Sequence, residues 1–244
     1  CRHLRHLIFR NEKNLYYNKS AKSGKTVIAL YPINSPFKII DQDEWWDDSF
    51  DATLYERDFD FQKPFFKQYK DLQLSVPRWA RIVVNSTNSD FCNNCANVKD
   101  CYLTFSSYES QNLYYCTRVF RSADCVDCLN VSDSQFCSMS VHCKHCYNLH
   151  YSFLCNGCYD SYFIFDCRTS KNCIMTAQVR NEEYMIRGKR YSKEQYETEK
   201  TKFLKEFAET PDAVKKEFQE MLKNTYHKNP NMIKSENCEG DFIN

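Results

Sequence analysis

The side chains best suited to chemistry in this sequence are its cysteines, and their spacing is regular. Of the 15 cysteines, the 13 between Cys92 and Cys173 are all separated by multiples of three residues. In the same frame, every third residue from Ser89 to Val179 is Ser, Cys, Val, Thr, Leu or Ile. Thiols can bind a metal, form disulfides, or fill a narrow core as small apolar groups. The spacing alone leaves these three uses open.

Two groups of cysteines have a spacing that suits a metal site. The first is a C-x2-C-x8-C-x2-C pattern formed by Cys143, Cys146, Cys155 and Cys158, and a looser second group is Cys116, Cys125, Cys128 and Cys137. Four converging thiolates would accept zinc or an iron-sulfur cluster. His142 and His145 lie outside the frame of three, so we do not expect them to share a metal with these cysteines. A disulfide between Cys137 and Cys143, or between stacked coils, is the alternative.

A second period sets the length of the repeating unit. Seven of the eight positions spaced by 12 from Asn88 to Asn172 are Asn or Asp, and Phe136 is the exception. These residue types close turns and tolerate left-handed backbone angles. Regular repeats of this kind indicate a solenoid. We therefore expect a mainly β fold, a β-solenoid of about 12-residue coils with four inward positions per coil.

Coils of this size have no room for aromatic rings inside, so we expect the aromatic side chains to point outward. Six of them should share one wall as a possible binding face: Tyr102, Tyr114, Tyr115, Tyr151, Tyr162 and Phe163. A contiguous exposed aromatic patch is typical of an interface with a partner. The alternative is that the N-terminal region or the terminal helices cover this wall.

Residues 1–79 are expected to form a small α+β region. The pattern predicts an amphipathic helix over 2–16, a pair of strands over 26–31 and 37–40, and a helix over 63–74. The SGKT sequence at 23–26 lacks the first glycine of a phosphate-binding loop, so it predicts a turn. Six acidic residues around Trp45 and Trp46 predict either a solvated helix start with Trp anchors or a metal or sugar site.

Residues 80–181 should form the solenoid, because the inward frame extends back to about Ala80 and is broken at Glu182. Residues 182–233 should form a helical hairpin that caps the end of the coil stack. Ser192 with Gln195 predicts a capping box that opens the first helix, and Thr210 with Pro211 predicts the start of the second. The tail at 234–244 would begin a second solenoid.

The coil pattern resembles the 12-residue solenoids of insect antifreeze proteins, whose repeat also places small residues inward at every third position. This resemblance implies a right-handed coil. Antifreeze activity needs a flat outward array of threonines, and the matching positions here are Tyr, Phe, Leu, Val, His and Met. The antifreeze function is therefore not carried over.

Nearly the whole chain resembles uncharacterised Cys- and Tyr-rich proteins common in metagenomes of small-genome bacteria. The resemblance rests on LIFRNEKNLY at 7–16, WWDDSFDATLYERDFDFQKPFFKQ at 45–68, DCYLTFSS at 100–107, DSYFIFDC at 160–167 and VRNEEY at 179–184. It implies a zinc-ribbon-like segment ahead of the first stretch, with Cys1 as its last ligand, and hence a chain truncated at both ends. It implies no activity.

The composition limits the possible functions. The formal net charge is +1, which does not support binding to nucleic acid or to a membrane surface, and no stretch is long and apolar enough to span a membrane. Reduced cysteines would place the protein in the cytoplasm, and disulfides would mean export. We expect a non-catalytic structural or binding module with a protein or carbohydrate partner. Metal or redox binding by the inward cysteines is the alternative, and a carbohydrate-active β-helix enzyme is the weakest candidate.

Overall fold

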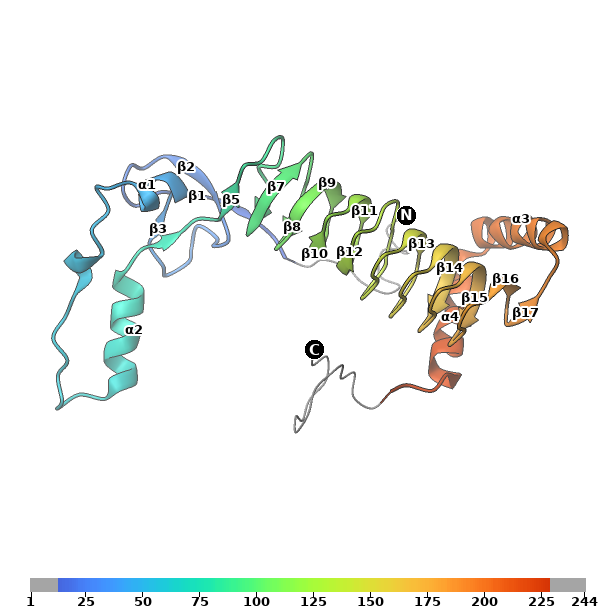
Figure 1. Ribbon diagram of the computed structural model, residues 1–244. Coiled ribbons are helices and arrows are strands. Elements are labelled where there is room, and N and C mark those ends of the chain that lie inside the picture. Colours follow the sequence, from blue (N-terminus) through green and yellow to red (C-terminus); the bar gives the residue numbers. More distant parts are fainter. Residues whose placement is uncertain (1–12, 229–244) are drawn as a thin grey trace.

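The computed structural model describes residues 13–228. Its central part is a rod of stacked coils, with a smaller α+β region before it and two helices after it (Figure 1). The expected fold class is thus confirmed. No helix in this part of the chain is long and apolar enough to cross a membrane.

The coils stack by parallel pairing in steps of 12 residues. Cys92 pairs with Thr104, and Leu149 pairs with Ser161. The rod contains about nine coils, and their spacing of roughly 12 residues is the one expected from the Asn/Asp period. Its short strands are β5 (Val83–Val84), β6 (Cys92–Asn93), β7 (Cys95–Lys99), β8 (Thr104–Phe105), β9 (Tyr108–Tyr114), β10 (Thr117–Phe120), β11 (Ala123–Val126), β12 (Leu129–Ser132), β13 (Tyr147–His150), β14 (Tyr159–Phe165), β15 (Lys171–Ala177) and β16 (Glu183–Ile186).

The bends between walls explain why the coil is so short. From Asn85 to Arg187 every third residue except Phe91 has a positive φ, so each coil turns at four left-handed positions. The Asn/Asp column is only one of these four. The other three columns include bulky residues such as Tyr115, Arg118 and Arg121 in the same conformation, which costs about 1–2 kcal/mol per residue. Backbone hydrogen bonds between adjacent coils must offset this cost.

Small polar side chains fill the interior because they also satisfy its backbone. The Ser122 hydroxyl donates to the Phe120 carbonyl at 2.8 Å and accepts the N–H of Ser134 at 3.1 Å. Ser134 repeats the arrangement with the Cys146 N–H at 3.3 Å. The hydroxyls of this buried serine column therefore bond to the backbone.

The N-terminal region contains the expected strands, but their expected pairing is wrong. Its elements are β1 (Tyr16–Lys19), β2 (Thr26–Ala29), β3 (Ile39–Ile40), α1 (Gln42–Trp46), a 3-10 turn (Ala52–Tyr55), α2 (Phe65–Ser75) and β4 (Arg78–Trp79). β2 pairs antiparallel with β1, while β3 pairs in parallel with β4. A turn between Pro32 and Ser35 separates the two strands and lets each find another partner.

Three further expectations for this region can be compared with the structure. The SGKT segment is a turn, in which the Gly24 N–H donates to the Ser20 carbonyl. The expected helix over 2–16 falls mostly outside the described residues, and Tyr16 at its end belongs to strand β1. α2 confirms the helix expected over 63–74.

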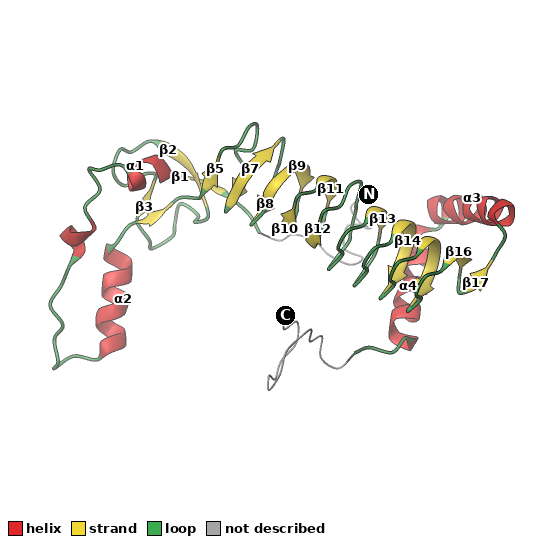
Figure 2. Ribbon diagram, in the orientation of Figure 1, coloured by secondary structure: helices red, strands yellow, loops and turns green. Residues whose placement is uncertain are grey.

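The solenoid extends about half a coil beyond the expected boundary at residue 181, because β16 ends at Ile186. β16 pairs with β15, and Met185 takes an inward position after Glu182. β17 (Lys189–Arg190) then pairs antiparallel with β16 and ends the stack. α3 (Lys193–Glu209) opens with the expected Ser192–Gln195 capping box, and α4 (Pro211–Asn224) follows it (Figure 2). Thr210 lies between them but makes no side-chain cap; its hydroxyl donates back to the Glu206 carbonyl.

Candidate functional sites

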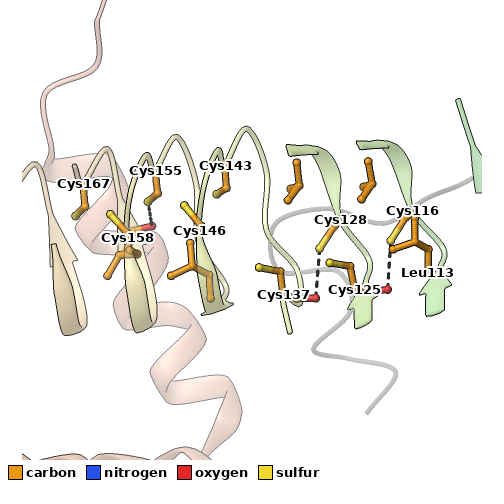
Figure 3. Packing of buried hydrophobic residues seen from close by; sticks show 14 of the residues in the cluster. Leu113, Cys116, Cys125, Cys128, Cys137, Cys143, Cys146, Cys155, Cys158 and Cys167 are labelled. Carbon is orange, nitrogen blue, oxygen red and sulfur yellow. Dashed lines mark hydrogen bonds between the residues drawn. The ribbon is translucent and has the colours of Figure 1, made fainter. Parts of the chain in front are cut away.

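All 13 described cysteines point into the rod, are buried, and are free thiols (Figure 3). All but Cys92 lie close to the carbonyl two residues before them: the Cys146 sulfur is 2.9 Å from the Lys144 carbonyl oxygen and the Cys128 sulfur 3.4 Å from that of Val126. Many also approach a carbonyl of the next coil, as Cys116 does with Cys125 at 3.4 Å. The thiols thus act first as small donors to the backbone. Cys1 and Cys238 lie outside the described residues.

The structure brings together the four cysteines of the first predicted metal site. The Cys143 thiol interacts with those of Cys146 and Cys155, and Cys155 interacts in turn with Cys158 and Cys167. These contacts form a chain along the rod axis rather than a cluster around one point. Within residues 13–228, no group of three or more His, Cys, Asp or Glu side chains is arranged to hold a metal ion.

The second predicted group has the same form. The Cys125 thiol interacts with those of Cys128 and Cys137, and Cys128 interacts with Cys116. The two histidines nearest the first group are outside the rod, as expected: His142 pairs with Asn130 at 2.8 Å and His145 faces Asp133 at 3.4 Å.

Burial keeps several of these thiols protonated. Loss of hydration raises the pKa of Cys101 to about 11 and that of Cys173 to about 12, and it raises the pKa of Cys128 and Cys155 well above the ordinary thiol value. A neutral, enclosed thiol is a poor nucleophile. These cysteines are therefore unsuited to covalent catalysis.

The expected aromatic wall is present, but it is open only in part. Its members fall in two adjacent columns, in which residues repeat every 12 positions. Tyr102 and Tyr114 pair in neighbouring coils, and they are 40% and 41% exposed. Tyr102 also packs at a tilt against Phe91, which contacts Tyr17 of β1 edge-on. The N-terminal half of the wall thus presents ring surface at its outer side.

The C-terminal half of this wall is covered by the two terminal helices, which corrects its expected role as a binding face. Phe163 is fully buried and its ring packs edge-on against those of Phe203, Phe207 and Phe218. Tyr151, stacked on Phe163 at 4.5 Å, and Tyr162 are partly buried in the same apolar cluster. The apolar stripes of α3 and α4 therefore cover a lateral wall of the last coils. The two helices are not confined to the end of the coil stack (Figure 1).

Most of the acidic side chains around the tryptophans have local structural roles. Asp41 and Glu44 form a capping box at α1, and Asp51 caps the short turn that follows. The tryptophans are less enclosed than expected for anchors. The rings of Trp46 and Trp79 stack with centroids 6.4 Å apart, and Trp46 is 67% exposed.

The sequence reasoning missed the most exposed aromatic group. Five side chains on α2 and the loop before it project from the N-terminal region, and we call them the aromatic arm: Phe59, Phe61, Phe65, Phe66 and Tyr69. Their exposed fractions range from 46% to 87%. The spacing of Phe65, Tyr69 and Leu72 at i, i+4 and i+7 was the available signal, because it marks an apolar helix stripe with no evident partner.

The chain matches no protein-family model, and no similar sequence was found among curated proteins.

Proposed function

We propose that the protein is a non-catalytic binding module in which the solenoid is a rigid spacer and exposed aromatic side chains contact a protein partner. The observation that supports this most directly is the state of α2. The helix has 11 residues and none of them is buried, while Phe65 and Phe66 are 56% and 81% exposed.

A helix of this length needs a packing partner. Isolated helices shorter than about 12–15 residues are marginal in water, and most helical stability in proteins comes from burying an apolar face. The local support for α2 is polar: Gln68 bonds to both backbone groups of Asp60, and Lys63 pairs with Asp60 at 2.8 Å. A partner that covers the aromatic arm would supply the missing apolar contact.

The partner surface should be tested at the arm itself. A photo-crosslinking amino acid placed at Phe66 should give one dominant protein adduct in extracts of cells that express the protein natively. Phe61→Ser and Phe65→Ser should each reduce that adduct by about tenfold, because each removes apolar contact. The same crosslinker at Phe136, which is 46% exposed on the solenoid, is the matched control. Equal adducts at both positions, or none at Phe66, would reject the proposal.

A second measurement addresses the helix directly. Amide hydrogen exchange in α2 should be fast in the isolated protein and slow by about tenfold or more when the captured partner is added. Exchange in β14 should not change, because its inward residues are already buried. An α2 that is strongly protected in the isolated protein would contradict the argument.

Metal binding by the inward cysteines is the second candidate, and the thiol chain around Cys143 supports it. Hydrogen bonds from Cys146 and Cys155 lower the pKa of Cys143, which favours a thiolate of the kind that zinc or iron binds. Zinc or an iron-sulfur cluster there would require the chain of contacts to close around one point.

One experiment separates the candidates: a free-thiol count on unfolded, unreduced protein, with metal analysis of the same sample. About 15 thiols without metal would support a reduced structural core and the binding module. One or more zinc or iron atoms per chain, lost in Cys155→Ser, would support the metal candidate. Few thiols and no metal would mean a disulfide-bonded, exported rod.

A further inference from the structure

A polar cavity lies where the N-terminal region meets the first coil. Its volume is about 570 Å³, and its lining comes from β2, α1 and the segment that enters the solenoid. The lining side chains with hydrogen-bonding groups include Asp41, Asp43, Arg81, Asn85, Ser86 and Asp90. A cavity of this size accommodates a small organic ligand.

Arg81 is the unusual member of this lining. Its Nη1 is buried without a hydrogen-bond partner, and Arg81 forms no ion pair with the described residues, although three carboxylates line the same cavity. A buried donor without a partner is unfavourable, because it has lost its hydrogen bonds to water and gained none in return. Unsatisfied polar groups of this kind are concentrated at functional sites, where a ligand supplies the missing hydrogen-bond partner.

Two residues with exposed indole rings, Trp46 and Trp79, lie close in sequence to residues that line the cavity. Trp46 lies three residues after Asp43 on α1, which places both on one face of the helix, and Trp79 lies two residues before Arg81. The Trp46 and Trp79 rings are inclined by only 22° to each other, and 67% and 36% of these residues are exposed. The junction therefore combines flat apolar ring faces with planar polar groups.

We propose that this cavity and the two indoles bind a neutral sugar, as the end of an oligosaccharide. A sugar ring has an apolar C–H face, which stacks on indole, and hydroxyl groups that both donate and accept. Carboxylates such as Asp43 and Asp90 accept hydroxyl protons, while Arg81 donates to ring and hydroxyl oxygens. This site goes beyond the partner contact proposed for the aromatic arm and uses other residues.

The charges of the lining decide between a sugar and its nearest competitor. A nucleotide could also stack on tryptophan and pair its phosphate with Arg81. However, three carboxylates face one guanidinium here, so the site would repel a phosphate or a uronate. A neutral ligand with many hydroxyl groups avoids this repulsion.

The test starts with an array of neutral, uronate and amino oligosaccharides, and GMP as the nucleotide probe. At least one neutral oligosaccharide should bind, and its affinity is then measured by calorimetry. Trp46→Ala and Arg81→Met should each weaken binding by about tenfold or more, whereas Phe136→Ala should change it by less than about twofold. No neutral binder, or binding only of uronates or GMP, would overturn the proposal.

Arg81→Met also separates a binding role from a structural one. If Arg81 serves the ligand, its replacement should weaken binding by about tenfold or more and leave the free protein at least as stable, because an unpaired buried donor is removed. A variant that unfolds would mean that Arg81 supports the junction, and Trp46→Ala, at a largely exposed residue, would then decide. Sugar binding that survives Trp46→Ala would overturn the proposal.

Discussion

At the residue scale, the inward position selects side chains that are small and can bond to the backbone. Ser and Cys meet both requirements, because each donates to the carbonyl two residues before it, as Ser110 and Cys95 do at 2.9 and 3.3 Å. Valine or leucine fits only where the neighbouring coils leave enough space. Two predictions follow from this division of roles.

The first concerns the buried hydroxyl of Ser134. Ser134→Ala should lower the free energy of unfolding by about 1–3 kcal/mol, because the Cys146 N–H then loses its acceptor. Urea denaturation measures the change. Ser132→Ala is the control, since that hydroxyl points outward and has no hydrogen bond within the described residues; an equal effect of both changes would contradict the role given to Ser134.

The second concerns alkaline pH. Cys101 and Cys173 have folded pKa values of about 11 and 12, above the ordinary thiol value of 9.0. Unfolded thiols ionise first, so their contribution to stability is complete below pH 9 and is lost as the pH rises toward 11 and 12. Each thiol changes the unfolding free energy by up to about 1.4 kcal/mol per pH unit. Cys101→Ser should flatten the decline measured between pH 8 and 11; an unchanged slope would refute this.

At the scale of the elements, the Asn/Asp column is a ladder of side-chain hydrogen bonds between coils. Asn88 donates to Asp100, Asn112 to Asp124 and Asn148 to Asp160, at 2.7 to 2.9 Å. The alternation has a simple electrostatic reason. Stacked carboxylates would repel each other, whereas an amide between two of them donates a hydrogen bond.

Asn112→Asp tests this ladder by placing three carboxylates in successive coils. The change should destabilise the fold by about 1–2 kcal/mol, since like charges on neighbouring strands repel. The loss should shrink at high salt and below about pH 4, where carboxylates are protonated. Asp124→Asn should be tolerated, because it creates no like-charge contact. Thermal unfolding of both variants at pH 7 and pH 4 measures the difference.

In the first coil, the side-chain amide of Gln42 takes the place of a neighbouring strand by bonding to both backbone groups of one residue. Gln42 accepts from the Val83 N–H at 2.7 Å and donates to the Val83 carbonyl at 3.1 Å. Gln42→Ala should speed amide exchange at Val83 and around β5 by about fivefold or more, leaving β14 unchanged. Gln42→Glu keeps the acceptor and loses the donor, so its effect should be intermediate. If amide exchange in β5 is the same in both variants as in the unmodified protein, Gln42 does not stabilise the first strand of the solenoid.

The sequence was sufficient to predict the coil length and the inward frame, because a narrow coil restricts every third position in the same way. It also brought Cys143 and Cys155 together, since residues 12 apart are neighbours. The pairing of β3 with β4 could not be predicted, because it joins segments almost 40 residues apart. The cavity at Arg81 could not be predicted for the same reason, because its lining residues extend in sequence from Thr26 to Asp90.

At the scale of the whole molecule, the terminal helices and the solenoid share one apolar cluster. Phe163 lies at its centre, and the Tyr196 hydroxyl is buried in it without a hydrogen-bond partner. How much of the aromatic wall the two helices cover could not be predicted from the sequence. It depends on contacts between the helices and the coils, and the three-residue repeat carries no information on these contacts.

This cluster gives a prediction with a built-in contrast. Phe163→Ala should cost about 3–5 kcal/mol, because it removes a fully buried ring between α3, α4 and β14. Tyr196→Phe should be neutral or stabilising, because it removes only an unsatisfied hydroxyl. Tyr114→Ala, on the open half of the aromatic wall, should cost far less than Phe163→Ala. Calorimetric unfolding ranks the three, and a large loss for Tyr114→Ala would mean that the open half is also structural.

The equal spacing of the bends also defines which length changes the rod can absorb. Removing 12 residues deletes one coil and returns every later side chain to its own wall. Removing three residues keeps the inward residues inward but moves each later residue to the adjacent wall. The helices α3 and α4 would then no longer lie on the same side of the rod as the exposed aromatic columns of the N-terminal coils. Insertions and deletions of three residues can therefore rotate one end of the rod relative to the other by one wall, about a quarter of a turn, without altering its core.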